Sequence, residues 1–353
     1  MNERSTIIVL NPGSTSTKIA WFRDEEEVLR ETFLHDATIL SQYVDIWSQF
    51  DFRLRLVQKW MRQIPEKPSA VVGIGGLLGP VPSGTYRVNQ KMLMDARANL
   101  QGAHASNLGC AMAFDVARQF DCPAFIVDPV SVDEFSPLAR YSGHPSIPRR
   151  SLSHALNIHA TARRAAREIG KANDKASFVI AHLGGGISIV PVKDGKIVDA
   201  NDASSEGPFS PERTGGLPLQ QFISLCFSGK YEEQELRSIV MGGGGLKAYL
   251  GTNSLSEVEQ RIGTGDVQAK EVFDAMCYQI AKEIGAMATV LFGNLDGIVL
   301  TGGMSTSELL VSLITKRVST LGKVLVYPGE NEMLALAHGA LRVLRNEEQS
   351  KEY

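Results

Sequence analysis

The chain has 353 residues, of which 43% are hydrophobic and 21% are charged, and its formal net charge is −3. This length predicts about two globular domains. The slight negative charge provides no basic field for nucleic acid, and no apolar run reaches the roughly 20 residues that span a bilayer. The four cysteines include no Cys-x-x-Cys pair, which predicts free thiols and a cytoplasmic protein.

Three polar, glycine-containing turns follow buried strands along the chain. The first hairpin covers Ile7–Phe22 with its turn at Asn11–Lys18, and the second covers Phe178–Val190 with its turn at His182–Gly186. A third turn, Thr301–Ser305, follows another apolar run. The two hairpins begin about half a chain length apart, which suggests that the chain has two similar halves.

The segments between and after these turns have apolar residues at the spacing that is typical of helices. Apolar residues recur every three or four positions from Val272 to Leu291, which predicts one long helix. Helices are also predicted over His154–Ile169, Glu308–Val318 and Asn331–Leu344, the last with Asn331 as its cap, and Asp194-Gly195 predicts a further hairpin turn. Strands that alternate with helices predict α/β layering. Because no low-complexity linker interrupts the pattern, we expect two closely packed domains.

The turn Asn11–Lys18 carries groups that suit a phosphate. Gly13 lets backbone amides point outward, Ser14 and Ser16 offer hydroxyls, and Lys18 supplies a cation; Asn11 can meet a metal or its water shell. Since the Walker and Rossmann fingerprints are both absent, any phosphate site must be built differently. Taken alone, this turn also fits a hairpin without a ligand, but three such turns at strand ends favour a nucleotide held between two domains.

These segments resemble a known family. Asn11–Lys18 resembles the first signature of the acetate and butyrate kinase family, within the sugar-kinase, actin and Hsp70 superfamily. His182–Ile189 is similar to the second phosphate segment of that family, and Val299–Gly303 to its adenosine segment. Four further segments resemble the butyrate branch more than the acetate branch: Gly143–Pro145, Arg149–Asn157, Pro211–Arg213 and Ala248–Asn253. The resemblance covers essentially the whole chain.

The resemblance implies phosphoryl transfer from ATP to a short-chain fatty acid such as butyrate, giving an acyl phosphate, and the reverse reaction that forms ATP. It implies an α/β fold of two ribonuclease-H-like, actin-like ATPase domains that flank a nucleotide cleft. The expected domains are an acyl-substrate and phosphate domain, residues 1–131 plus 329–353 with the returning C-terminal helix, and a nucleotide-binding domain, residues 132–328. ATP or ADP, Mg²⁺ and a homo-oligomer (dimer or higher) are also implied.

The family's functional positions carry over to matching residues of this chain. Asn11 and Glu332 would lie near the magnesium. Ser14, Ser16 and Lys18 would face the transferred phosphate, supported by His182, Gly184, Gly185 and Gly186, while Gly302 and Gly303 would bind the nucleotide. His154 would stabilise the transition state, Arg213 would bind phosphoryl or carboxylate oxygens, and Asp128 would sit at the reacting centre. Because a carboxylate nucleophile has no proton to lose, this chemistry needs cations and donors rather than a strong base.

One position departs from the family pattern. The family typically has an arginine, thought to meet the substrate carboxylate, where this chain has Ile74, beside Gly75 and Gly76 of the predicted substrate pocket. No aliphatic side chain replaces the bidentate pairing of arginine with a carboxylate. Arg213 or backbone amides would then hold the acid alone, or the substrate is another acid (acetate, propionate or a branched acid), or the chain is a nucleotide-binding homologue with weak or no turnover.

Overall fold

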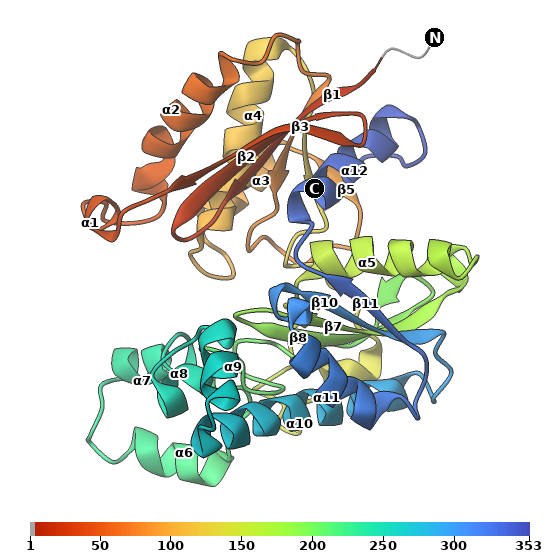
Figure 1. The fold of residues 1–353 in the computed structure, drawn as a ribbon. Coiled ribbons are helices and arrows are strands. Elements are labelled where there is room, and N and C mark those ends of the chain that lie inside the picture. The colour runs from red at the N-terminus through yellow and green to blue at the C-terminus, as the bar shows by residue number, and fades with distance from the viewer. Residues whose placement is uncertain (1–3) are drawn as a thin grey trace. The chain divides into compact units, whose positions relative to one another are not determined.

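The computed structural model describes residues 4–353, and their packing separates two units. The first comprises the described residues up to Asp133 together with Asn331–Tyr353, and the second comprises Glu134–Glu330. Each unit is an α/β layer structure built on one sheet (Figure 1). Within the described part of the chain, no helix is both long and apolar enough to cross a membrane. The four cysteines are free thiols.

The first unit has a seven-stranded sheet in the order β12-β5-β6-β4-β1-β2-β3. Its strands are β1 (Thr6–Pro12), β2 (Ser16–Arg23), β3 (Glu26–Leu34), β4 (Ala70–Ile74), β5 (Thr85–Arg87), β6 (Ala124–Val127) and β12 (Lys351–Glu352). The antiparallel pairing of β1 with β2 confirms the first predicted hairpin. Strands β1, β4 and β6 are parallel neighbours. Parallel strands are usually covered on both faces, which explains the fully buried runs Ile7–Leu10 and Ala70–Val72.

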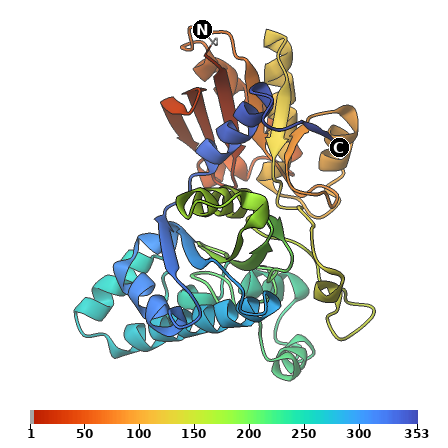
Figure 2. The same cartoon turned by 90° about the vertical axis from the view of Figure 1, so that its right-hand side faces the viewer.

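The helices of the first unit are α1 (Ala37–Leu40), α2 (Phe50–Met61), α3 (Gln90–Arg97), α4 (Leu108–Phe120) and α12 (Glu332–Leu344). Glycines set the closest packing of helix on sheet: a Cβ on Gly73 would overlap the Gly109 carbonyl of α4, and one on Gly339 of α12 would overlap Val127. Figure 2 shows α12 lying against this sheet, where it packs on β1 and β4. Asn331 precedes α12 but has φ −102° and ψ 38° rather than extended backbone, so the predicted side-chain cap is not formed within the described helix.

The second unit has a five-stranded sheet in the order β11-β10-β7-β8-β9. Its strands are β7 (Ser177–Leu183), β8 (Ile187–Lys193), β9 (Lys196–Ile197), β10 (Gly297–Gly302) and β11 (Val324–Pro328). The antiparallel pairs β7–β8 and β8–β9 confirm the two hairpins predicted here. The order repeats the segment β6-β4-β1-β2-β3 of the first sheet, with three leading strands in a meander and two parallel strands added beside the first. The expected likeness of the two halves is therefore confirmed.

The helices of the second unit are α5 (Ala155–Glu168), α6 (Leu219–Cys226), α7 (Glu233–Val240), α8 (Gly245–Leu250), α9 (Leu255–Gly263), α10 (Val267–Val290) and α11 (Glu308–Val318). Helices α5, α10 and α11 confirm the predictions made from helical spacing. Figure 1 shows α5 on one face of the sheet and α10 with α11 on the other. The apolar stripe of α10, which includes Phe273, Ile280 and Ile284, is fully buried in the core.

The carboxyl ends of the parallel strands lie together at one end of each sheet, where the strands stop. In the first unit, β1 ends at Pro12, β4 at Ile74 and β6 at Val127. In the second unit, the corresponding strands are β7, β10 and β11. Ligands of open α/β sheets bind outside the carboxyl ends of such strands. The fold thus brings segments that are distant in the sequence to the edge where ligands of this fold class bind.

Candidate functional site

The turn between β1 and β2 presents the first group of predicted residues. Asn11 and Lys18 are directly opposite each other in the antiparallel register, so their side chains share one face. The Gly13 amide donates to the Ser16 carbonyl at 2.8 Å and closes the turn. Ser14 is exposed, and its Oγ lies 3.4 Å from Nε2 of His104. The turn therefore holds an amide, a hydroxyl and an ammonium group on a short, well-defined backbone.

Asn11 is joined to Glu332, the first residue of α12. The Asn11 Nδ2 donates to Oε2 of Glu332 at 2.8 Å, which leaves Oδ1 of Asn11 and Oε1 of Glu332 as hard oxygen donors. The described residues contain no group of three or more His, Cys, Asp or Glu side chains that could hold a metal. Mg²⁺ prefers oxygen ligands, keeps several waters and is often bound through one or two carboxylates plus substrate phosphates. The two oxygens of Asn11 and Glu332 would therefore suit Mg²⁺ if waters and substrate phosphates completed its coordination.

Asp128 lies directly after β6 in strained backbone. Its φ is 38° and its side chain is 1% exposed, and Oδ1 accepts a hydrogen bond from the Gly84 amide at 2.6 Å. Positive φ at a residue other than glycine is uncommon, though aspartate adopts it more readily than most, and such strain collects at functional sites. The neighbouring strand ends at Ile74, whose register partner is Val127. Asp128 and Ile74 therefore lie at the same edge of the sheet.

The two glycines after Ile74 have a packing role. A Cβ on Gly75 would press on Pro129, 2.8 Å from its Cα, and a Cβ on Gly76 would lie 2.6 Å from the Asn107 Cα. Both distances are shorter than any real Cβ contact. These glycines let the loop after β4 pack against its neighbours, so their presence is explained without a ligand.

Two histidines form the centre of the predicted site in the second unit. The rings of His154, just before α5, and His182, on β7, are stacked with centroids 4.0 Å apart at 15°. His154 Nδ1 lies 2.9 Å from the Ser188 Oγ, and His182 Nδ1 lies 3.0 Å from Oδ1 of Asn157. Burial, and then the neighbouring His182 and Arg213, lower the pKa of His154 well below its usual range. At neutral pH His154 is thus a neutral hydrogen-bonding group.

Arg213 packs directly on the glycine turn that joins β7 to β8. A Cβ on Gly186 would lie 2.7 Å from the guanidinium carbon of Arg213, so a larger residue here would make the guanidinium shift. Arg213 Nη1 also donates to the Ala203 carbonyl at 3.3 Å. Burial lowers the pKa of Arg213, whereas Glu212 and Asp202 oppose that shift. The fold thus brings three predicted residues from distant segments, His154, His182 and Arg213, together on one glycine turn.

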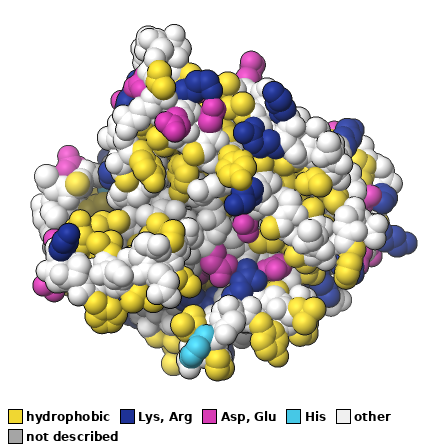
Figure 3. Space-filling model, turned by 90° about the horizontal axis from the view of Figure 1, so that it is seen from below, with side chains coloured by type: hydrophobic (Ala, Val, Ile, Leu, Met, Phe, Trp, Pro, Cys, Tyr) yellow, Lys and Arg dark blue, Asp and Glu magenta, His cyan; other side chains and the backbone are white. Residues whose placement is uncertain are grey.

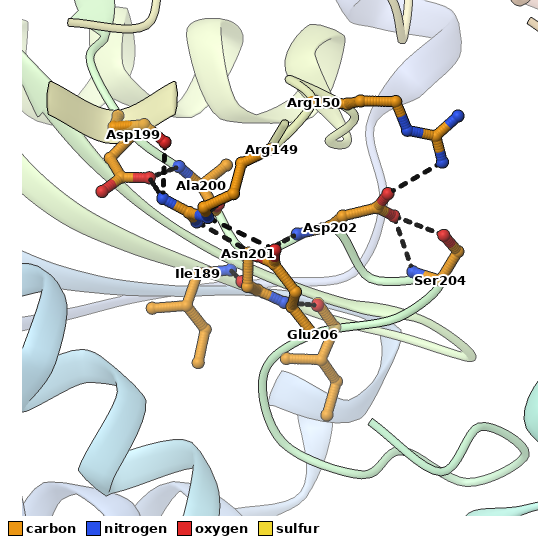
Figure 4. A network of polar contacts seen from close by, with 11 residues as sticks. Arg149, Arg150, Ile189, Asp199, Ala200, Asn201, Asp202, Ser204 and Glu206 are labelled. Carbon is orange, nitrogen blue, oxygen red and sulfur yellow. Dashed lines mark hydrogen bonds and ion pairs between the residues drawn. The ribbon is translucent and has the colours of Figure 1, made fainter. Parts of the chain in front are cut away.

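A network of charged residues fixes the loop that contacts Arg213 (Figure 4). Arg149 donates to Asp199 at 2.8 Å and to Glu206 at 3.0 Å. Arg150 pairs with Asp202 at 3.2 Å. Asn201 ties the same loop to β8 by accepting from the Ile189 amide at 2.6 Å. Both arginines therefore hold the loop at 199–206, whose Ala203 carbonyl accepts from Arg213.

Glycines also seat the backbone of Arg213. Gly245 has φ 60°, and a Cβ there would overlap the Ser210 carbonyl. A Cβ on Gly244 would lie 2.6 Å from the Thr214 amide nitrogen. Gly244 and Gly245 therefore let α8 begin directly against the segment at 210–214. This is a function of these glycines that the sequence alone did not indicate.

The turn after β10 lies next to the end of β7. Gly302 has φ 90°, and a Cβ there would lie 2.7 Å from the Leu183 amide nitrogen. A Cβ on Gly303 would meet open space, and this residue is exposed. Glu330, which was not predicted as a site residue, lies after β11 with Oε1 3.6 Å from Nε2 of His182. The ends of β7, β10 and β11 thus meet around His182.

A separate cavity of about 720 Å³ lies in the second unit between α6, α7 and the loop at 204–205, and its lining includes Arg150, Phe222 and Arg237. Of the described residues that line it, none belongs to the predicted site. Nearby α6 is poorly buried: Leu219 is 74% exposed, and Phe227, just after the helix, is 87% exposed. Figure 3 shows hydrophobic side chains among charged ones on the face seen from below.

Comparisons with known proteins identify relatives of this chain. Residues 145–350 match the model of the acetokinase family. The chain is 48% identical over 351 residues to butyrate kinase 2 of Clostridium acetobutylicum, covering 98% of this chain and 99% of that protein. It is also 48% identical over 350 residues to a probable butyrate kinase 2 of Caldanaerobacter subterraneus subsp. tengcongensis, covering 98% and 99% of the two chains.

Solved structures show the same fold. The acetate kinase of Porphyromonas gingivalis superposes with a TM-score of 0.81 at 16% identity, covering 96% of this chain and 100% of that one. A propionate kinase from Francisella tularensis superposes with a TM-score of 0.76 at 20% identity, covering 95% and 98%. The predicted fold class, with two actin-like ATPase units, is confirmed. The family match and the close relatives together establish that the chain belongs to the acetokinase family.

Proposed function

We propose that the protein transfers a phosphoryl group between ATP and a short-chain fatty acid of the butyrate type, and catalyses the reverse transfer to ADP. The observation that carries the proposal is the assembly of neutral His154, stacked His182 and cationic Arg213 on one glycine turn. Relatives at 48% identity that are named butyrate kinases support the choice of acid. Cytoplasmic location and a homo-oligomeric state remain predictions.

The two units have different roles in this proposal. The first unit takes the acyl substrate and the transferred phosphate, and the second holds the nucleotide. Lys18, Ser14 and Ser16 contribute one ammonium and two hydroxyls to phosphate oxygens. Asn11 and Glu332 hold Mg²⁺, which when bound neutralises charge on the phosphate oxygens. Asp128 lies at the reacting centre, where its negative charge orients neighbouring cationic or hydrogen-bond donor groups.

The chemical step needs no general base. A carboxylate oxygen of the acid forms a bond to the γ-phosphorus while the bond from that phosphorus to the bridging oxygen of ADP breaks, and the electron pair leaves with ADP. Arg213 neutralises charge on the equatorial oxygens, and His154 donates a hydrogen bond to them. His182 keeps the His154 ring in place by stacking. The amides at Gly184–Gly186 and the open space at Gly303 receive the nucleotide.

Trapping the product tests this function. The protein is incubated with ATP, Mg²⁺ and butyrate in the presence of hydroxylamine, which converts an acyl phosphate to a coloured hydroxamate. We expect butyryl hydroxamate in the forward direction, and ATP formation from butyryl phosphate and ADP in the reverse direction. Nucleotide binding without acyl phosphate from any short-chain acid would instead indicate a homologue without turnover, the alternative that Ile74 motivates.

A further inference from the structure

Arg53 of α2 is a buried cation that the proposed chemistry does not use. It is 0% exposed, and its described acceptors are all uncharged: the Gln49 amide oxygen, the carbonyls of Gly13, Ser14 and Ser16, and the Thr17 hydroxyl. Burial lowers the pKa of Arg53 to about 10, so the group remains charged at neutral pH. A buried charge is costly unless hydrogen bonds compensate for it, and these acceptors supply that compensation.

The acceptors belong to the turn that is proposed to take the transferred phosphate. Arg53 Nη1 donates to the carbonyls of Gly13 and Ser16, each at 2.9 Å, and Nη2 approaches the Ser14 carbonyl at 3.4 Å. In a trans peptide unit the N–H points opposite to the C=O, and the described chain has no cis peptide bond. The amides that follow these carbonyls, including those of Ser14 and Thr15, therefore point away from Arg53. Arg53 thus fixes which side of the turn carries donors.

A second contact extends this arrangement to Thr17. A guanidinium only donates, so the Thr17 hydroxyl accepts from Arg53 at 3.1 Å and its own proton is free for Nε2 of His35, 2.8 Å away. Burial, and then the charge of Arg53, lower the pKa of His35 to about 4, so His35 is a neutral acceptor at working pH. The His35 amide also donates to the Thr15 carbonyl at 2.9 Å. Thr17, next to Lys18, is thereby held in one orientation.

We propose that Arg53 is a positioning residue for phosphoryl transfer. It draws the carbonyls of the turn inward, leaves the amides that follow them directed outward, and adds a buried positive charge behind a site for an anion. A charge in a buried setting is screened less than one at the surface. The inference rests on the proposed function in one respect, the binding of the transferred phosphate at this turn.

Arg53→Ala and Arg53→Lys test the proposal, with Arg55→Ala as the matched control because Arg55 lies exposed on the same helix. Arg53→Ala is expected to lower kcat by on the order of 100-fold, the usual cost of a misplaced catalytic group, and to weaken binding of butyryl phosphate. Arg53→Lys keeps the charge but cannot bridge several carbonyls, so it should be intermediate. The Kd for ADP should change by less than about twofold, because Arg53 contacts a turn of the first unit whereas the second unit is proposed to hold the nucleotide.

Chemical rescue separates positioning from general loss of structure. Millimolar guanidinium chloride should restore part of the activity of Arg53→Ala by filling the vacated space, whereas urea at the same concentration should not. Arg55→Ala should respond to neither. Unchanged kcat in Arg53→Ala, or an equal loss of ADP binding without rescue, would overturn the inference.

Hydrogen exchange distinguishes failure of this inference from failure of the proposed function. If the wild-type protein forms no acyl phosphate from any acid, the proposed function is wrong. Hydrogen exchange of the turn amides then tests separately whether Arg53 holds the turn. Amides in the peptide that covers Gly13–Lys18 should exchange faster in Arg53→Ala than in the wild type or in Arg55→Ala. Equal exchange in all three proteins would show that Arg53 does not hold the turn.

Discussion

The electrostatic character of the site depends on how deeply each ionisable residue is buried and on the charges of its neighbours. His154 is part-buried next to His182 and the guanidinium of Arg213, so protonating it would place a second positive charge beside an existing one. Arg213 stays cationic because Glu212 and Asp202 oppose the effect of burial. The site therefore pairs one fixed cation with one neutral donor, and that pairing leads to separate predictions for the two residues.

His154 should not titrate near neutral pH. Because burial, then His182 and Arg213, lower its pKa well below 6.5, the neutral form predominates at neutral pH and stays so as the pH rises. The kcat of the wild type should therefore show no His154 ionisation between about pH 6 and 8, while His154→Gln lowers kcat at every pH in that range. Measuring kcat against pH for both proteins checks this. An inflection near 6.5 that is lost in His154→Gln would contradict it.

Arg213→Ala should lower kcat far more than it weakens ATP binding. If the guanidinium acts on charge that develops during transfer, its loss costs on the order of 100- to 1000-fold in kcat. Steady-state kinetics and equilibrium titration with ATP give the two quantities, and Arg237→Ala, which removes an exposed arginine of α7, serves as the control. Equal losses in kcat and in ATP affinity would assign Arg213 to ground-state binding of the nucleotide.

Ile74→Arg tests the one departure from the family pattern. The side chain lies at the carboxyl end of β4, beside the strand that leads to Asp128. A guanidinium there would pair with the substrate carboxylate, and a charge-assisted hydrogen bond is worth about 1.5–3 kcal/mol, so the KM for the acid should fall by about tenfold or more. Ile74→Leu is the matched control. An unchanged KM in Ile74→Arg would show that this position does not meet the carboxylate.

At the scale of elements, tight glycine contacts determine where the site segments can lie. The start of α8 is the clearest case, because Gly245 combines a left-handed φ with a backbone carbonyl in the space where a Cβ would lie. Gly73 likewise lies against the backbone carbonyl of Gly109 in α4. The site therefore depends on close approaches of backbone that larger residues would prevent.

Gly245→Ala should destabilise the protein, whereas Gly263→Ala should not. Ala at a positive φ costs more than about 1 kcal/mol, and the overlap with Ser210 adds to that cost. Gly263 ends α9 with open space around it, and alanine favours a helix more than glycine does. The free energy of unfolding in urea measures both variants. Equal stability of Gly245→Ala and the wild type would show that α8 does not depend on this glycine.

Strands β1, β2 and β7–β10, the glycine turns and the four helices α5, α10, α11 and α12 could be predicted because each shows a local pattern. Arg53 was missed because its partners are backbone carbonyls, which carry no sequence signature. One signal was present: Arg53 precedes Val57 by one helical turn and Trp60 by two, so it lies on the buried face of α2.

The predicted Asn331 cap is not formed because a cap needs extended backbone, which residue type alone does not guarantee. The stack of His154 on His182 depends on tertiary packing and could not be predicted from spacing.

At the scale of the whole molecule, the two sheets repeat one five-strand order, and in each the leading hairpin carries a glycine-containing turn. The repeat explains why a hairpin with a glycine-containing turn occurs in both halves of the chain. The two turns differ, with Lys18 and buried Arg53 in the first unit and stacked histidines with Arg213 in the second. This difference supports distinct roles for the two units in the proposed transfer.

The most direct test is the dependence of kcat/KM on the length of the acid. Rates of acyl phosphate formation are measured with ATP and Mg²⁺ for straight-chain acids from two to five carbons, with isobutyrate as a branched comparison. The proposed function predicts acyl phosphate from several of these acids, with the highest kcat/KM for butyrate. A maximum at acetate would contradict the assignment to butyrate, and ATP binding without acyl phosphate from any acid would contradict the function itself.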